Sequence, residues 1–269
     1  MNSITAIFLG LVQGITEFLP ISSSGHLALL EHYLKVPGAG LSFDILLHLG
    51  TLAALVGYFW REWLAMGHAL VRPSPQNRGE RYLFLYLVMA TIPGGLAGLL
   101  LEKKAETIFR EPLHIALLLG SVGILLLVGE KVARHHRAFD RLTIFDAVLI
   151  GLSQALAIMP GVSRSGITMT CALFLGFTRE ASARFSFLLA TPIIAGAGLH
   201  HLPHWFKAPQ EDLSKTAAAL GFLAALISSY LTIKYLLRFL KRHTFKPFAY
   251  YRLAVMALVL LLTFLYPAF

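Results

Sequence analysis

Two long apolar stretches of this chain are each broken by proline, serine and glycine, and these breaks limit how the chain can fold. The first stretch, Ile4–Leu34, is interrupted at Leu19–His26 (LPISSSGH), and the second, Ile144–Phe177, at Met159–Gly166 (MPGVSRSG). Proline removes a backbone donor and disfavours helix at the residue before it. Each stretch is therefore predicted to form two short helices joined by a turn, a hairpin that enters and leaves a membrane by the same face.

Six other stretches are apolar and long enough to cross a bilayer, for which a helix needs about 20 residues. The chain is 57% hydrophobic and 14% charged, whereas a soluble domain has about 25% charged residues. This composition excludes a cytosolic enzyme, a disordered chain, a collagen and a coiled coil. The predicted fold class is an all-α polytopic membrane protein with six transmembrane helices and two re-entrant hairpins. The predicted spans are Leu41–Trp60, Tyr82–Leu101, Leu113–Gly129, Ala183–Leu199, Thr216–Leu237 and Leu253–Phe269.

The excess of basic residues sets an orientation. The net charge is +9, and the Lys and Arg residues lie in short loops without the aromatic residues of a nucleic-acid site, so no nucleic-acid partner is expected. Arg61–Arg81, Glu130–Thr143 and Arg238–Arg252 are predicted to be cytoplasmic, while the charge-balanced Glu102–Pro112 and His200–Lys215 face outward. Both termini then lie outside, the first hairpin enters from the outer face and the second from the cytoplasmic face. The N-terminus lacks the basic segment of a signal peptide, so no cleavage is expected.

An internal repeat accompanies this orientation. A shift of 141 positions aligns several residues of the first hairpin with the second: Gly10 with Gly151, Gln13 with Gln154, Ser22 with Ser163, Ser24 with Ser165 and Gly25 with Gly166. The chain is predicted to be one integral membrane domain, 1–269, with repeat halves of about 1–140 and 141–269. Inverted repeats with broken helices place their site near the midplane, so the two tips should meet.

Polar and ionisable residues are concentrated at the two breaks. A charged side chain inside a bilayer is costly unless it is paired, so Glu17, His26 and Arg164 are functional candidates. Gln13 lies four residues before Glu17, and Ser23 three before His26, spacings that place each pair on one helix face. The serines open a helix whose free N–H groups bind anions, and an arginine fork fits phosphate oxygens. Together these residues indicate a phosphoryl-transfer site.

Structural roles are the alternatives for each of these residues. The first serine run serves as a helix cap in one interpretation, Arg164 neutralises Glu17 as a structural pair, and His26 is a hydrogen-bonded core histidine. Asp44 and His48, four residues apart on the next span, are either a structural pair or support for the site. The occurrence of serines, charges and turns at both tips favours the functional interpretation.

At these motifs the chain resembles the bacterial undecaprenyl-diphosphate phosphatases, also called bacitracin resistance proteins. The resemblance covers nearly the whole length and is strongest at Gln13–His26 (QGITEFLPISSSGH), Pro160–Gly166 (PGVSRSG) and Phe185–Pro192 (FSFLLATP). It implies an inverted-repeat membrane hydrolase that removes the terminal phosphate of undecaprenyl diphosphate. The product, undecaprenyl phosphate, is the lipid carrier of peptidoglycan synthesis, and hence serves cell-wall biogenesis and cell shape. The resemblance also implies a bacterial inner-membrane location with a site that opens toward the periplasm.

The mechanism expected from these residues is a phosphoryl transfer. Ser23 attacks phosphorus with help from His26, while direct attack by water remains an alternative. Glu17, with Gln13, either ligates a divalent ion, Mg²⁺ or Ca²⁺, or positions the water. Gln13 departs from family members with two carboxylates, which weakens the case for a metal ligand at that position. The expected phosphate-binding residues are Arg164, Ser163, Ser165, Ser22, Ser24 and Gly25.

A second function is compatible with the same pattern. Inverted repeats with broken helices are typical of transporters, so the alternative is a carrier or flippase that moves a polyprenyl phosphate with the same anion pocket. A carrier needs only the anion clamp, whereas a phosphatase also needs a nucleophile. The expected partners are a polyprenyl diphosphate and membrane lipids. The sequence leaves the oligomeric state open, with a homodimer as one arrangement.

Overall fold

The chain folds into α-helices joined by short turns. The computed structural model describes residues 1–34, 41–207 and 214–265, and these contain no β-strand beyond one isolated bridge, between Arg137 and Phe177. The helices are α1 (Ser3–Thr16), α2 (Ser23–Leu34), α3 (Leu41–Tyr58), α4 (Trp60–Val71), α5 (Arg78–Phe109), α6 (Pro112–Val132), α7 (Ile144–Ala155), α8 (Arg164–Phe174), α9 (Arg179–Lys207), α10 (Lys215–Leu240) and α11 (Lys246–Leu265), with 3-10 turns η1 (Phe139–Arg141) and η2 (Leu156–Ile158).

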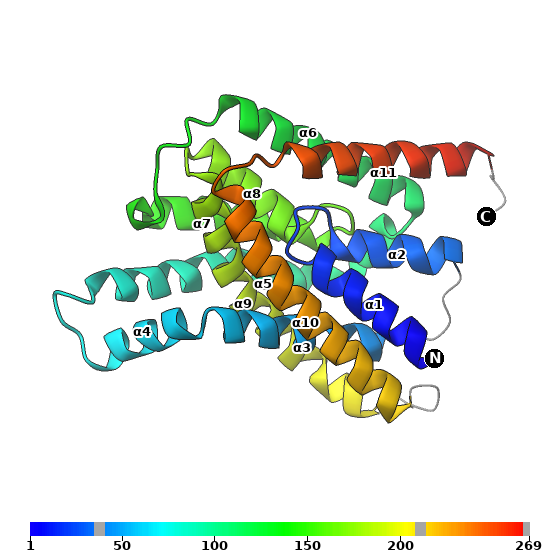
Figure 1. Ribbon diagram of the computed structural model, residues 1–269, viewed down its shortest axis with the longest axis horizontal. Helices are drawn as coiled ribbons and strands as arrows, with labels where there is room; N and C mark the ends of the chain where they lie inside the picture. Colours follow the sequence, from blue (N-terminus) through cyan, green and yellow to red (C-terminus); the bar gives the residue numbers. More distant parts are fainter. Residues whose placement is uncertain (35–40, 208–213, 266–269) are drawn as a thin grey trace.

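The helices confirm the predicted class of all-α multi-pass membrane protein. Among the described residues, five helices are long and apolar enough to cross a membrane, or six if the bent pair α3–α4 forms one span. The two interrupted stretches are pairs of short helices, α1–α2 and α7–α8, as the prolines and glycines predicted. In Figure 1 the start of α1 and the end of α11 lie at one end of the molecule, and α4 lies at the other.

The ends of several helices differ from the prediction. The segment Arg61–Arg81 was predicted to be a loop, but it contains α4 and the start of α5. The chain bends by 70° between α3 and α4, where Phe59 is buried. Helix α4 buries Met66 and Ala69 and exposes its charged face. A hydropathy scan ends a span at the first charges, whereas an amphipathic helix continues through them.

Three further spans are longer than their apolar cores. Helix α5 extends to Phe109 and α9 to Lys207, so the predicted outward loops are largely helical. Residues 208–213, in the second of these loops, lie outside the described residues, as do residues 266–269 of the last predicted span. Helix α11 begins at Lys246 rather than Leu253, which places Arg252 inside a helix. Arg252 was counted among the cytoplasmic loop charges, and this was wrong, because its side chain is completely buried.

The hairpins pack in matching ways on the rest of the bundle. Helix α1 lies against α10, and α7 lies against α5 (Figure 1). Gly10 and Gly151, the aligned glycines of the repeat, lie at these two contacts. A Cβ atom at Gly10 would lie 3.2 Å from the Ala225 nitrogen, and one at Gly151 would lie 2.7 Å from the Ala90 Cα. Both hairpins therefore depend on a glycine that lets two helix backbones approach.

A second set of contacts lies away from the hairpin tips. Glu130, at the end of α6, accepts hydrogen bonds from Arg179 Nε (2.8 Å), Arg179 Nη2 (2.6 Å) and the Phe245 N–H (2.7 Å). This buried carboxylate joins α6, α9 and the segment before α11. Nearby, in the loop before α7, hydrogen bonds to Asp146 raise the pKa of the Arg137 guanidinium above its ordinary value.

The close contact at Gly151 yields a stability prediction. Gly151→Ala should lower the melting temperature in detergent and destabilise the fold by about 1–3 kcal/mol, because the new methyl group meets the Ala90 backbone. Gly95→Ala in α5 is the matched control, since a Cβ there meets nothing within 4 Å and alanine favours helix by about 1 kcal/mol. Equal melting temperatures for the two variants would contradict this packing.

Candidate active site

The two hairpin turns share an unusual backbone conformation. Ser22 has φ of 78° and Ser163 has φ of 72°, and these two residues align in the internal repeat. Positive φ costs a residue other than glycine about 1–3 kcal/mol. Each serine precedes a helix and caps it: Ser22 Oγ accepts from the Gly25 N–H (3.3 Å) and Ser163 Oγ from the Gly166 N–H (3.0 Å). The same strained cap therefore ends both turns.

The two turns are in contact, as expected from the repeat. The Gly161 N–H donates to Ser22 Oγ at 3.2 Å, and Ser165 Oγ donates to the Leu19 carbonyl at 3.0 Å. A Cβ atom at Gly25 would lie 3.3 Å from the Gly161 Cα, so the backbones touch there. Polar groups of each turn are thus satisfied by the other turn.

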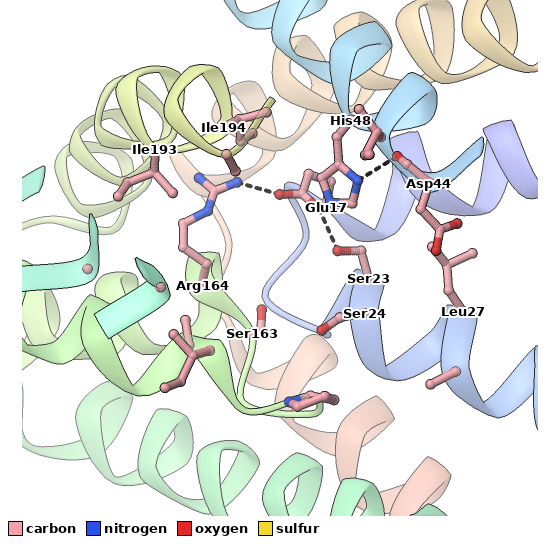
Figure 2. Close-up of a pocket in the computed structure, with 18 of the residues that line it drawn as sticks. Glu17, Ser23, Ser24, Leu27, Asp44, His48, Ser163, Arg164, Ile193 and Ile194 are labelled. Carbon is pink, nitrogen blue, oxygen red and sulfur yellow. Dashed lines mark hydrogen bonds and ion pairs between the residues drawn. The ribbon is translucent and has the colours of Figure 1, made fainter. Parts of the chain in front are cut away.

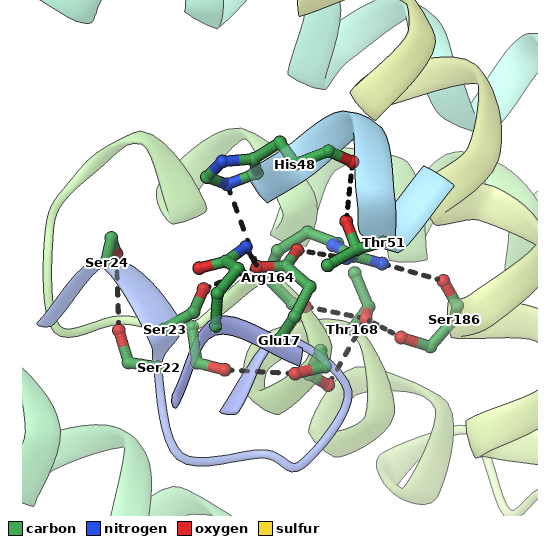
Figure 3. Close-up of polar contacts among 12 residues, drawn as sticks. Glu17, Ser22, Ser23, Ser24, His48, Thr51, Arg164, Thr168 and Ser186 are labelled. Carbon is green, nitrogen blue, oxygen red and sulfur yellow. Dashed lines mark hydrogen bonds and ion pairs between the residues drawn. The ribbon is translucent and has the colours of Figure 1, made fainter. Parts of the chain in front are cut away.

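Glu17 is the centre of the polar contacts at the tips (Figure 3). Its Oε1 accepts from Arg164 Nη2 at 2.6 Å, an ion pair between the two halves of the chain. Its Oε2 accepts from Ser23 Oγ at 2.5 Å and from Gln13 Nε2 at 3.0 Å, and lies 3.8 Å from His48 Nε2. Charge-assisted hydrogen bonds of this kind are about twice as strong as neutral ones. The carboxylate is therefore held by side chains from three separate segments.

A cavity of about 350 Å³ opens beside this cluster. Its polar end is formed by Glu17, Ser23, His48, Ser163 and Arg164, with Ser24 and Asp44 beside them. Figure 2 shows Ser23 and Arg164 approaching the cavity from opposite sides. The rest of the wall is mostly apolar and includes Leu27, Ala28, Ile45, Ile158, Ile193, Ile194 and Ala197. A polar head and an apolar tail therefore both find matching surfaces here.

The expected phosphate-binding residues fall into two groups. Ser24, Ser163 and Arg164 line the cavity. Ser22 and Ser165 are buried, and their hydroxyls bond the opposite turn or the neighbouring serine. Gly25 is buried at the contact with the second turn. This second group holds the tips together, while the first faces the space where a phosphate can bind.

The structure does not pair Ser23 with His26. His26 Nδ1 donates to the Ser22 carbonyl at 2.7 Å, and its Nε2 is 2.8 Å from the Tyr251 hydroxyl. The imidazole also stacks with the Tyr251 ring. Ser23 is the first residue of α2, so its side chain points back toward the preceding turn and Glu17. The expected histidine–serine pair is thus replaced by a glutamate–serine pair.

His48 is the histidine that faces Glu17. Its Nδ1 donates to the Asp44 carbonyl at 2.8 Å, which leaves Nε2 directed at Glu17. The spacing of Asp44 and His48 had suggested a pair of side chains, but the structure shows a bond to the Asp44 main chain. The sequence did mark His48 as an ionisable residue within a predicted span. That it lies beside Glu17, where His26 does not, became clear only once the structure placed α3 beside the first hairpin.

The motif Phe185–Pro192, in α9, contacts Arg164 and the helix that carries it. The Ser186 carbonyl accepts from Arg164 Nη1 at 3.3 Å, and the Ser186 and Thr168 hydroxyls are hydrogen-bonded at 2.7 Å. Phe187 contacts Phe18 edge-to-face, with ring centroids 5.3 Å apart. These contacts fix the neighbours of both charged residues in the site.

The oxygen donors at the first tip fit a hard cation in part. Gln13 Oε1 is buried and has no hydrogen-bond partner among the described residues, while Nε2 of the same amide donates to the Glu17 carboxylate at 3.0 Å. Mg²⁺ and Ca²⁺ prefer such oxygen ligands. Within the described segments, no three His, Cys, Asp or Glu side chains are grouped so that they could hold a metal on their own. A cation at this tip would need substrate oxygens to complete its ligands.

Comparison with known proteins identifies the family of the chain. A family model described as bacitracin resistance protein BacA matches residues 6–258. A protein named undecaprenyl-diphosphatase from Moorella thermoacetica is 48% identical over 260 residues, 96% of this chain and 97% of the relative. One of the same name from Pelotomaculum thermopropionicum is 43% identical over 267 residues, 97% of each chain. The chain belongs to the bacitracin resistance protein BacA family.

Proposed function

We propose that this membrane enzyme hydrolyses undecaprenyl diphosphate to undecaprenyl phosphate and phosphate. The observation that carries the proposal is the carboxylate of Glu17, which joins the Ser23 hydroxyl to the Arg164 guanidinium where two hairpin turns meet in a cavity. A nucleophile, a base and an anion clamp are the parts that phosphoryl transfer needs. The activity for which its relatives are named is a hydrolase activity and favours this function over that of a carrier.

The diphosphate head and the isoprenoid tail of the substrate fit different parts of the cavity. The diphosphate lies at the polar end of the cavity between Ser23 and Arg164, and the isoprenoid tail follows the apolar wall along α2, α3 and α9. The guanidinium has five N–H donors, and in the described part of the chain its hydrogen bonds go to Glu17 and the Ser186 carbonyl. Further donors thus remain for phosphate oxygens, and Ser24 and Ser163 lie beside them.

In the first step Ser23 Oγ attacks the terminal phosphorus. A bond forms between Oγ and phosphorus, the bond from that phosphorus to the bridging oxygen breaks, and undecaprenyl phosphate leaves with the electron pair. The hydroxyl proton moves to Glu17 Oε2, its hydrogen-bond partner. Arg164 offsets the charge that develops on the equatorial oxygens. His48 Nε2 lies beside the carboxylate as the next acceptor of the proton.

In the second step water hydrolyses the phosphoserine. Glu17, having passed its first proton to His48, takes a proton from the water, whose oxygen bonds to phosphorus. The bond between phosphorus and Ser23 Oγ breaks, inorganic phosphate leaves, and Glu17 returns the proton to Ser23 Oγ while His48 releases its own to solvent. Direct attack of water on the terminal phosphorus is the alternative, in which Glu17 takes the proton of that water and no phosphoserine forms. Trapping of a phosphorylated Ser23 peptide distinguishes the two routes.

A divalent cation is also proposed for this site. Glu17 and the unbonded Oε1 of Gln13 would hold it together with diphosphate oxygens. When bound, such an ion supplies charge neutralisation to the leaving undecaprenyl phosphate.

The membrane placement is proposed to be the bacterial inner membrane, with the site open to the periplasm and the two halves as an inverted repeat. The clusters of Lys and Arg between spans support this orientation. The matching strained serines and glycine contacts of the two hairpins support the repeat. The start of α1 and the end of α11 lie at the same end of the molecule, as this topology requires (Figure 1).

Arg164→Ala should reduce phosphate release from undecaprenyl diphosphate by about 1,000-fold or more, because the clamp on the transferred phosphate is lost. The measurement is kcat/KM of purified protein in detergent, with size-exclusion chromatography to confirm folding. Arg78→Ala, an exposed arginine stacked on Tyr82 in α5, is the control and should keep its activity. Normal turnover by a folded Arg164→Ala protein would exclude the clamp.

Ser23→Ala should lower kcat by more than about 1,000-fold and remove the phosphoserine trapped in a rapid quench. Ser121→Ala, on an exposed part of α6, is the control. If Ser23→Ala retains turnover near that of the unmodified protein, water rather than serine is the nucleophile.

Chelation with EDTA should abolish phosphate release, and added Mg²⁺ or Ca²⁺ should restore it. Gln13→Glu adds a carboxylate beside Glu17 and should lower the cation concentration that gives half-maximal activity by about tenfold. The same ion should raise the melting temperature of the protein in the presence of a non-hydrolysable diphosphate lipid. Unchanged activity after chelation would rule out the cation.

A further inference from the structure

Arg252 is an arginine of α11 that lies completely inside the protein. Helix α11 runs beside α6, close to the two hairpin tips (Figure 1). A buried cation normally has a carboxylate partner, because desolvation of an isolated charge is costly. In the described part of the chain, every hydrogen bond of the Arg252 guanidinium goes instead to a main-chain carbonyl. Arg252 therefore donates hydrogen bonds to backbone carbonyls rather than neutralising an acidic side chain.

The carbonyls belong to both hairpin turns and to α6. In the first turn, Arg252 Nη1 donates to the Pro20 carbonyl at 3.0 Å. In the second, Nη2 donates to the carbonyls of Gly161 at 2.8 Å and Val162 at 3.1 Å. On α6, Nε donates to the Leu119 carbonyl at 2.8 Å and Nη2 lies 3.4 Å from that of Leu118. One planar group thus connects three segments that are far apart in sequence.

These carbonyls need donors for a physical reason. The turns leave helical geometry inside the membrane domain, where water is scarce, and a buried carbonyl without a hydrogen-bond donor destabilises the fold. A guanidinium presents five N–H groups in a rigid fork, so it reaches several carbonyls at once. A lysine ammonium keeps the charge but directs its three donors from a single point.

The same carbonyls are adjacent to the reacting residues. Pro20 is three residues from both Glu17 and Ser23, and Val162 precedes the strained Ser163 and then Arg164. The first turn of α8 also packs on the fork, because a Cβ at Gly166 would lie 3.2 Å from Arg252 Nη1. A shift of the fork therefore shifts both tips.

We propose that Arg252 is a positioning residue that holds the two hairpin turns in register, so that Ser23 and Glu17 of one tip face Arg164 of the other. This inference rests on the proposed phosphatase function for its kinetic part only. A displacement of about 1 Å between a nucleophile and its electrophile reduces rate by about 100-fold. Substrate affinity comes chiefly from the long apolar tail, and two of the three helices along it, α3 and α9, receive no hydrogen bond from Arg252 in the described part of the chain.

The test compares Arg252→Lys with Arg179→Lys in lipid nanodiscs. Arg179 is a partly buried arginine whose carboxylate contact joins α6 and α9 away from the tips. For Arg252→Lys we expect kcat to fall by about 10–100-fold while KM changes less than about threefold. Arg179→Lys should lower the melting temperature but keep kcat. If Arg252→Lys does not fold, Arg252→Gln and Arg179→Gln replace the two lysine variants.

Hydrogen exchange gives a readout that does not depend on activity. In the Arg252 variant, amide protection should fall together in peptides covering 18–26 and 160–167, whereas the Arg179 variant should leave both peptides unchanged. If the unmodified protein releases no phosphate from undecaprenyl diphosphate, the proposed function is refuted. The exchange measurement then still tests whether Arg252 positions the two turns. Unchanged protection in both turns, or kcat within twofold of the unmodified protein, would overturn the inference. A kcat that falls equally in the two variants, in proportion to melting temperature, would also overturn it.

Discussion

The ion pair between Glu17 and Arg164 is the contact on which the rest of the site depends. Each residue lies in a hairpin turn within the membrane domain, where a lone charge is costly, and each neutralises the other at 2.6 Å. The pair also forces the two halves of the chain together, because its members are 147 positions apart. Since the same carboxylate accepts a hydrogen bond from Ser23, the contact that makes burial tolerable also brings together the three side chains of the proposed reaction.

Broken helices bring a second constraint, which is the supply of hydrogen-bond partners to backbone that has left helical geometry. The two turns meet this need in three ways: the capping serines at positive φ, the bonds from one turn to the other, and the fork of Arg252. The first device is repeated in both halves, whereas Arg252 occurs once and serves both. The site is thus built from two similar turns and from one arginine of α11 that bonds both of them.

The periodicity and breakers of the sequence predicted the class of fold well, and they located both hairpins within a few residues. Their limits appear at α4, α5 and α9, which extend into charged segments that hydropathy assigns to loops. A helix needs one apolar face to continue, whereas a membrane span needs apolar residues all round, and a window average detects only the second. For the same reason Arg252 was counted as a loop charge, although its side chain is completely buried beside the tips.

The sequence by itself determined that the chain crosses a membrane several times, that it carries two interrupted hairpins, and that Glu17, Ser23 and Arg164 are the residues to examine. Polarity, proline and serine leave these signals locally, so spacing along the chain was enough. The tertiary structure decided which histidine faces the carboxylate, because His26 turns to Tyr251 and His48 arrives from α3. It also decided the role of Arg252. Both outcomes depend on which helices lie side by side, and a contact between distant segments leaves no mark in the local pattern of either one.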